Sequence, residues 1–377
     1  MFGRAPAPTL RLLRTLAHLK MSTNKSSSTT TTTITTTTPL TVAVICPPDN
    51  QTVLLTLPQR SDVSYLVAND IDTFQAHPDF KNIRAIMYVA VGGRVELLPT
   101  LFDALALDTG STSVQWVHSL FAGVDALGPF IASHLRETNI PLTNGRGAFS
   151  ESLAEYVLAS ALHFNKKIST IQTNHENKKW DKFVMSTLKG KTMGFVGYGH
   201  IGTTTARLAK AFGMNVLALR RNTSKKSEYA DHVFGQSEKI KLFQESDIVV
   251  SVLPGTEETK NYCGAAEFQA MKQSGVFISV GRGLVVDEDA LCNALDSNEI
   301  AGAALDVFKT EPLPLESRLW SVENDKILLT AHNADFTEDY FRLGWNIFEQ
   351  NLNIFIASDG NAGEQEMITP VDKDSGY

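Results

Sequence analysis

The stretch Lys191-Thr192-Met193-Gly194-Phe195-Val196-Gly197-Tyr198-Gly199-His200-Ile201-Gly202 decides the fold of this chain. An apolar run leads into three glycines with G-x-G-x-x-G spacing, and residues 203–212 follow with a helical pattern. A strand, a glycine turn and a helix in this order are the fingerprint of a dinucleotide-binding unit. Gly197 permits the tight turn, Gly199 lets the backbone approach a pyrophosphate, and Gly202 lets the helix pack on the strand. The helix N-terminus attracts phosphates, so we expect His200 and Ile201 to lie beside them.

The strand predicted after this helix, within residues 215–223, narrows the choice of cofactor. NAD sites usually have Asp or Glu at its end, roughly 20 residues past the glycines, to bind the ribose 2′-hydroxyl. This chain has Arg220 and Arg221 there, followed by Lys225 and Lys226. Because a guanidinium suits a 2′-phosphate, the sequence favours NADP(H). NAD(H) stays open if these residues are only solvated charges at a strand end.

The composition limits the classes of function. The chain has 377 residues and a net charge of −7, which predicts about two domains and argues against a nucleic-acid-binding surface. Its cysteines, Cys46, Cys263 and Cys292, are widely spaced, so we expect neither a disulfide framework nor a metal site. No segment is apolar for long enough to span a bilayer. We therefore expect no nucleic-acid, metal or membrane partner.

The first part of the chain, residues 1–40, has the pattern of a targeting extension. Four leucines between Leu12 and Leu19 share one helical face, arginines interrupt them, and Ser26–Thr38 is almost wholly Ser and Thr. A segment rich in arginine and hydroxyl residues and free of acids is typical of an organelle transit peptide, which predicts the mitochondrial matrix. The alternative is a functionless extension, with Met21 as the true start of a cytoplasmic protein.

The rest of the chain alternates between predicted strands and helices. This order predicts an α/β fold with two Rossmann-like, doubly wound parallel-sheet domains and a cleft between them. A long helix over 149–171 joins the domains, and a last helix over about 338–356 returns to the first. We expect a substrate domain over 41–146 plus 333–377 and a dinucleotide-binding domain over 147–332. The predicted strands are 41–46, 83–89, 114–118, 247–253, 275–280, 300–305 and 327–330.

Three polar residues stand at strand ends, where open α/β sheets bind their ligands: Arg282, Glu311 and His332. Hydride transfer to a carbonyl needs a proton carrier, and histidine is suited to that role. Glu311 could orient His332 and stabilise its imidazolium form, while Arg282 could grip a carboxylate and a carbonyl with its planar fork. Taken singly, each residue could be a surface turn, a solvated loop residue or a helix cap. Together, downstream of a nucleotide motif, they favour an active site.

The chain resembles the D-isomer-specific 2-hydroxyacid dehydrogenases from about Thr41 to the C-terminus. The resemblance implies that Arg282 binds the substrate, that Glu311 pairs with His332, and that His332 is the acid/base. It also implies a homodimer whose two domains close over the substrate. The stretches that carry it are the glycine motif, 119–127, 143–156, 280–284, 305–314, 328–332, 371–373 and 376–377.

The resemblance implies further contacts. It gives Val91, Gly92 and Gly93 as the loop whose backbone N–H groups hold the substrate carboxylate, as an anion nest would. Asp306 would contact the nicotinamide carboxamide. The remaining residues implied to line the cofactor are Pro254, Thr259, Val280 and Gly281. The chain departs from the family at Ala331, where a proline usually precedes the histidine, and at Arg220, where many members have Asp.

These observations predict an NADP(H)-preferring reductase of a small 2-oxo acid, with glyoxylate or hydroxypyruvate as the best candidates because the Gly92-Gly93 loop suits a short substrate. One alternative is an NAD-dependent D-2-hydroxyacid dehydrogenase with another substrate. Another is a dinucleotide-sensing binding protein that resembles the corepressors of this fold.

Overall fold

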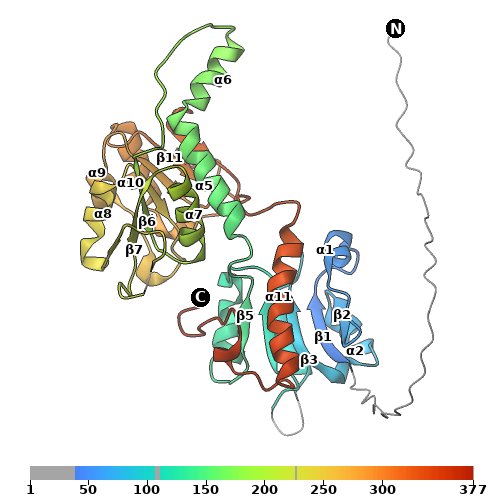
Figure 1. The fold of residues 1–377 in the computed structure, drawn as a ribbon. Helices are drawn as coiled ribbons and strands as arrows, with labels where there is room; N and C mark the ends of the chain where they lie inside the picture. Colours follow the sequence, from blue (N-terminus) through green and yellow to red (C-terminus); the bar gives the residue numbers. More distant parts are fainter. Residues whose placement is uncertain (1–38, 107–110, 226, 377) are drawn as a thin grey trace, which may run out of the picture. The chain divides into compact units, whose positions relative to one another are not determined.

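The computed structural model describes residues 39–106, 111–225 and 227–376, and residues 39–377 form one compact unit of the chain. Residues 1–38 of the predicted targeting extension therefore lie outside the described residues, as does Lys226, whereas Leu40, predicted as the last residue of the extension, begins the first strand of the fold. Two parallel sheets with helices on their faces account for most of the described chain (Figure 1). This confirms the predicted α/β fold class.

The first sheet has five parallel strands in the order β2-β1-β3-β4-β5. Alternate residues of β1 face opposite sides, as strand geometry requires: Ala43 and Ile45 pack toward α3, whereas Val42 and Val44 pack toward α11. The order reverses between β1 and β3, so the ends of these two strands form the switch point where ligands bind. The strands are β1 (Leu40–Ile45), β2 (Val63–Ala68), β3 (Ile83–Tyr88), β4 (Trp116–Ser119) and β5 (Leu142–Asn144), and the main helices are α1 (Gln51–Thr56), α2 (Ile71–Ala76), α3 (Leu97–Ala104) and α11 (Tyr340–Ala357).

The last helix, α11, belongs to this first sheet although it lies far along the chain, as expected from the sequence (Figure 1). Its aromatic side chains cover one face of the sheet. Phe348 stacks on Trp116 of β4, with ring centroids 5.2 Å apart, and Phe355 lies 5.3 Å from the same indole. Burial of such large apolar surfaces holds the helix to the sheet.

The second sheet has seven parallel strands in the order β12-β11-β10-β9-β6-β7-β8. The order reverses between β6 and β9, so the glycine motif after β6 stands at the second switch point. The strands are β6 (Thr192–Val196), β7 (Asn215–Leu219), β8 (His232–Phe234), β9 (Ile248–Ser251), β10 (Val276–Ser279), β11 (Gly302–Leu305) and β12 (Ile327–Leu329). The helices are α5 (Ser150–Asn165), α7 (His200–Ala211), α8 (Lys239–Glu245), α9 (Ala265–Ala270) and α10 (Glu288–Asp296).

The prediction of one long helix over 149–171 was wrong. Lys167 has φ of +51°, a left-handed conformation that ends α5 and starts a separate helix, α6 (Ile168–Glu176). None of the residues of α6 is buried. The apolar pattern of α5 continues into 171, so periodicity alone gave no sign of the break.

The sequence analysis also missed three strands, β2, β5 and β8. Two of them, β5 and β8, have only three residues, too few for a periodic signal. The third, β2, is an edge strand in which buried residues are interspersed with half-buried ones such as Ser64 and Tyr65, so it lacks a continuous apolar run.

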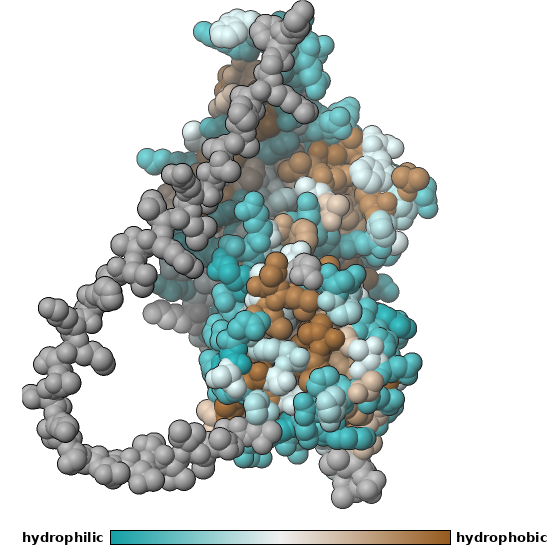
Figure 2. Space-filling model, turned by 90° about the vertical axis from the view of Figure 1, so that its right-hand side faces the viewer, coloured by the Kyte–Doolittle hydropathy of each residue, from teal (hydrophilic) through white to brown (hydrophobic). Residues whose placement is uncertain are grey.

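Within the described ranges, no helix is both long and apolar enough to cross a membrane. On the face in Figure 2, apolar residues gather in patches that are separated by hydrophilic ones.

Candidate active site

The glycine turn after β6 has the geometry of a dinucleotide-binding loop. Gly197 has φ of +92°, which favours glycine. A Cβ on Gly202 would stand 3.2 Å from the carbonyl oxygen of Gly197, so helix and turn pack closely here. A Cβ on Gly199 would meet nothing within 4 Å, so this side of the loop is open to a ligand. The three glycines thus have the local geometry that the motif requires, and their contacts with a cofactor stay predictions.

The N-terminus of α7 is prepared for an anion. Its N-cap residue, Gly199, makes no side-chain cap hydrogen bond, and the first turn contains no acidic residue. The N–H groups of the first turn and the helix dipole therefore favour a negative charge. Burial lowers the pKa of His200 in this turn, and the charges of Arg146 and Lys225 lower it further. Positive charge from two separate segments thus acts on the first residue of α7.

Arg220 follows β7 directly and lies beside the same turn. Its Nη1 donates to Ser227 Oγ at 3.1 Å and to the Lys225 carbonyl oxygen at 3.4 Å. Burial raises the pKa of Tyr198 to about 12, and the Arg220 charge opposes this effect. Arg221 is exposed, with its Nη1 3.7 Å from Glu258 Oε2. Arg220 is therefore the arginine that the structure brings to the glycine motif.

His332 and Glu311 form a hydrogen-bonded pair. His332 Nδ1 lies 2.7 Å from Glu311 Oε2, while Glu311 Oε1 accepts from the backbone N–H of Phe308 at 2.9 Å. With both carboxylate oxygens engaged, Glu311 selects the tautomer in which Nδ1 carries the proton, and Nε2 remains for proton exchange with a substrate. Both side chains are partly exposed, so a ligand can reach them.

Asp306 holds the loop that carries His332. It is 1% exposed, and its Oδ1 accepts from Thr330 Oγ1 at 2.6 Å and from the Asn333 N–H at 3.1 Å. The backbone N–H of His332 donates to the Asp306 carbonyl oxygen at 2.8 Å. His332 has φ of +50°, a strained conformation for a non-glycine residue. The bonds from Asp306 stabilise this turn, and the implied nicotinamide contact of Asp306 stays a prediction.

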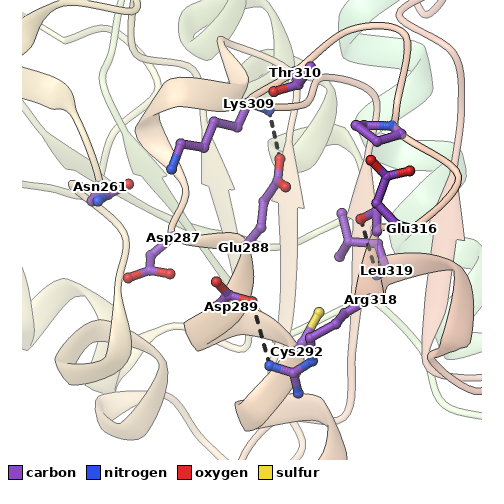
Figure 3. Close-up of a pocket in the computed structure, with 12 residues that line it drawn as sticks. Asn261, Asp287, Glu288, Asp289, Cys292, Lys309, Thr310, Glu316, Arg318 and Leu319 are labelled. Atoms are coloured by element: carbon purple, nitrogen blue, oxygen red, sulfur yellow. Dashed lines mark hydrogen bonds and ion pairs between the residues drawn. The ribbon is translucent and has the colours of Figure 1, made fainter.

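A hollow of about 300 Å³ is lined by Glu288, Lys309 and Thr310, among other residues (Figure 3). Glu288 Oε1 in its wall accepts from the backbone N–H of Lys309 at 2.6 Å. Neither His332 nor Arg282 lines the hollow, so it is not the predicted active site. Its contribution to the site is the Glu288 bond, which fixes the backbone two residues before Glu311.

Arg282 reaches from the end of β10 to the loop after β4. Its Nε donates to Asp125 Oδ2 at 3.0 Å, its Nη2 lies 3.0 Å from the same oxygen, and its Nη1 donates to the Gly281 carbonyl oxygen at 2.9 Å. The predicted substrate-binding arginine therefore spans from one sheet to the other.

The loop after β3 lies at the switch point of the first sheet. Gly92 has φ of +83°, and a Cβ on Gly93 would stand 2.2 Å from the Val89 carbonyl oxygen, so both positions need glycine. The Gly93 N–H donates to that oxygen at 3.0 Å, so one of the three N–H groups of the predicted anion nest is already engaged within the protein. Across the ranges that the structure covers, the N–H groups of Val91 and Gly92 have no acceptor. These two are the donors that remain for a substrate carboxylate.

The other predicted cofactor residues lie at the ends of β9 and β10. Thr259 Oγ1 donates to the Pro254 carbonyl oxygen at 2.6 Å and so ties its loop together. A Cβ on Gly281 would stand 2.5 Å from the Leu253 carbonyl oxygen, which explains the glycine there. Val280 is buried, and Ile201 packs partly into the same core. Contacts of these residues with a cofactor stay predictions.

Two acidic residues near Arg282 were missed by the sequence analysis. Asp125 lies in a stretch that carried the resemblance, but its partner is 157 positions away in the chain. Asp335 is half-buried; burial raises its pKa, and the nearby charges of His332 and Arg282 oppose that effect. Only its position three residues after His332 could have drawn attention to it. In the described part of the chain, no group of three or more His, Cys, Asp or Glu residues could hold a metal ion.

Comparison with known proteins places this geometry in a family. Residues 158–334 match the model of the D-isomer-specific 2-hydroxyacid dehydrogenase NAD-binding domain. A glyoxylate reductase from Aeropyrum pernix is 32% identical over 235 residues, which cover 59% of this chain and 68% of that protein. Glyoxylate/hydroxypyruvate reductase B from Enterobacter sp. (strain 638) is 37% identical over 203 residues, 52% of this chain and 62% of that protein.

A solved structure supports the same assignment. The D-isomer-specific 2-hydroxyacid dehydrogenase from Xanthobacter autotrophicus Py2, in complex with NADPH and MES, has a TM-score of 0.72 and 25% sequence identity. The similarity covers 90% of this chain and all of that one. The predicted family and enzyme class are confirmed: the chain belongs to the D-isomer-specific 2-hydroxyacid dehydrogenases, a family of NAD(P)-dependent oxidoreductases.

Proposed function

We propose that this protein is an NADP(H)-preferring reductase of a small 2-oxo acid, with glyoxylate or hydroxypyruvate as substrate. The observation that carries the proposal is the His332–Glu311 pair, because it holds a proton donor of the right type at the end of a parallel sheet. Arg282 supplies a fork for the carboxylate and the carbonyl oxygen. The names of the relatives from Aeropyrum and Enterobacter support this substrate class.

The glycine turn fits a dinucleotide. The open side of Gly199 leaves room for a pyrophosphate, and the uncapped α7 offers N–H groups to it. For the 2′-phosphate, Arg220 is the candidate partner. It follows β7 directly and stands where an NAD site usually has Asp or Glu. The NADPH complex of the Xanthobacter relative supports the preference.

The residues of the site then divide the chemistry between them. The reduced nicotinamide, when bound, supplies the hydride for the carbonyl carbon of the substrate. His332, protonated on both ring nitrogens, gives its Nε2 proton to the carbonyl oxygen as the C=O electron pair moves onto that oxygen. Glu311 stabilises the imidazolium before this transfer, and Arg282 stabilises the negative charge that develops on the oxygen. The N–H groups of Val91 and Gly92 hold the substrate carboxylate.

Steady-state kinetics test this proposal directly. Initial rates of NADPH and NADH oxidation should be measured with glyoxylate, hydroxypyruvate, pyruvate and a branched 2-oxo acid. Turnover of a small oxo acid with NADPH is expected. Turnover with NADH alone would favour the NAD-dependent dehydrogenase, while tight dinucleotide binding without turnover would favour the sensing protein.

The proposal includes a homodimer, as the family resemblance implies. The segment from α6 to residue 185 is a suitable contact surface for a second copy, because Trp180 is 96% and Val184 85% exposed. Large apolar side chains that stand this far out usually mark an interaction surface. Sedimentation equilibrium of the full chain and of a Trp180→Ser, Val184→Ser variant tests this, with a monomeric variant expected and an unchanged dimer contradicting it.

The proposed location is the mitochondrial matrix. Fusion of residues 1–40 to a fluorescent protein should direct it to mitochondria, and the same fusion begun at Met21 should stay in the cytoplasm. A cytoplasmic signal from both would leave the extension without a targeting role.

A further inference from the structure

Asp125 lies against the side of the Arg282 guanidinium. Nε and Nη2, the two nitrogens on one edge of the planar group, both contact Asp125 Oδ2 at 3.0 Å. Arg282 follows β10 of the seven-stranded sheet, whereas Asp125 follows β4 of the five-stranded sheet. The ion pair therefore connects the two sheets at the arginine that the proposed function uses for substrate.

The remaining N–H groups of Arg282 show what this contact does. A guanidinium has five N–H groups. One on Nε and one on Nη2 face Asp125, and one on Nη1 faces the Gly281 carbonyl oxygen. Five minus three leaves two, one on each terminal nitrogen, side by side on the outer end of the group. Among the residues that the structure covers, these two have no other partner.

This outer pair has the spacing that a carboxylate or a 2-oxo acid accepts in a bidentate way. The direction in which this pair points depends on the rotation of the Arg282 side chain, which is long and flexible. The contacts with Asp125 and with the Gly281 carbonyl oxygen fix that rotation. The Gly281 bond holds one inner edge from the neighbouring backbone, and Asp125 holds the other.

Gly123 completes the arrangement. A Cβ at this position would stand 2.0 Å from Arg282 Nη2, closer than any real contact. The loop after β4 thus has no side chain at the point where it meets the Nη2 end of the guanidinium. Two residues of one loop, an acid and a glycine, are therefore matched to the same arginine.

We propose that Asp125 is a positioning residue for the reaction: it aims the outer N–H pair of Arg282 at the substrate. This inference rests on the proposed function, in which Arg282 binds the 2-oxo acid. Asp125 acts through Arg282 and does not touch the reacting atoms. Because the pair joins the two sheets, the substrate meets a correctly oriented arginine only while the two sheets are held together at this contact.

Asp125→Ala and Asp125→Asn variants of the full chain test the proposal, with two readouts. The first is steady-state kinetics with glyoxylate and NADPH. The alanine variant should raise KM for glyoxylate and lower kcat, with a loss of about 10- to 100-fold in kcat/KM. KM for NADPH should stay the same. The asparagine variant keeps an acceptor oxygen for Nε and should recover part of the loss, which a merely structural role would not produce.

The second readout needs no turnover. Oxalate, a planar dicarboxylate, is titrated calorimetrically into the protein saturated with NADP⁺. The dissociation constant should rise about tenfold from wild type to Asp125→Ala, as expected when a fork loses its orientation. Failure of the wild type to reduce any oxo acid would defeat the proposed function, and the oxalate comparison would still decide the role of Asp125.

Asp289→Ala is the matched control. Asp289 Oδ1 lies 3.6 Å from Arg318 Nη1, so this variant also removes an aspartate paired with an arginine, but outside the proposed site. It should leave both readouts unchanged. The proposal is overturned if Asp125→Ala stays within twofold of wild type in kcat/KM and oxalate affinity, if NADPH binding weakens equally, or if wild type does not bind oxalate.

Discussion

His332 Nδ1 and Glu311 Oε2 lie 2.7 Å apart, on two loops that the sequence separates by 21 positions. Each loop is fixed by another carboxylate: Asp306 accepts N–H groups from the histidine loop, and Glu288 accepts the Lys309 N–H in the glutamate loop. The pair is thus supported from both sides before any ligand binds, which is what a proton donor of fixed tautomer needs.

Replacement of His332 by alanine removes the proposed proton donor. We expect kcat to fall by about 10²- to 10⁴-fold, the usual scale of acid–base catalysis. NADPH binding, measured by fluorescence titration, should be unchanged, because the glycine turn follows β6, whereas His332 follows β12. A Glu311→Gln variant should lose less, since its amide still accepts a bond from Nδ1. Full activity of the alanine variant would rule out His332 as the acid.

Replacement of Arg220 by aspartate should shift the cofactor preference. The new carboxylate would repel a 2′-phosphate and accept a bond from a 2′-hydroxyl. We expect the ratio of kcat/KM for NADPH over NADH to fall by about tenfold or more, the value of one charge-assisted contact. Arg221→Asp is the control at the neighbouring position. An unchanged ratio in Arg220→Asp would disprove the role of Arg220.

Two glycines of the motif should respond differently to alanine. A Cβ at Gly199 meets no protein atom, so Gly199→Ala should fold normally but weaken dinucleotide binding by obstructing the pyrophosphate. A Cβ at Gly202 stands 3.2 Å from the Gly197 carbonyl oxygen, so Gly202→Ala should lower the melting temperature as well. Thermal melts with and without NADPH check this. Equal melting temperatures for both unliganded variants would argue against the distinction.

The buried His118 should make stability depend on pH. Burial lowers the pKa of His118 to about 3, from 6.5, and its Nε2 has no partner among the described residues. Below pH 6.5 the unfolded chain takes up a proton that the folded protein does not bind until about pH 3. The stability contribution is therefore complete above pH 6.5 and is lost as pH falls, by up to about 1.4 kcal/mol per unit.

A His118→Gln variant removes this titration. From pH 7 to pH 5, denaturant unfolding should show wild type losing about 2 kcal/mol more than the variant. His175→Gln, at an exposed position of α6, is the control and should behave as wild type. Parallel pH profiles for wild type and His118→Gln would show that His118 does not titrate in this way.

The fold could be predicted where local physics dominates. The residues before Gly197 form an apolar run, and the spacing of the three glycines is typical of a strand–turn–helix unit. The positions of β6, the turn and α7 could therefore be predicted from the sequence. The break at Lys167 could not be predicted, because a left-handed backbone conformation at a polar residue does not change the periodicity of the apolar residues around it. The candidate pair His332–Glu311 could be anticipated because both residues follow strands of one sheet. Asp125 could not, since its partner comes from the other sheet and contact between them is a property of tertiary packing.

The most direct test of the central claim is the rate of NADPH oxidation with glyoxylate by wild type and His332→Ala, measured side by side at saturating cofactor. The account predicts turnover by wild type and a loss of about 10²- to 10⁴-fold in the variant, with equal NADPH affinity. Equal rates in the two proteins, or NADPH binding without turnover by wild type, would contradict it.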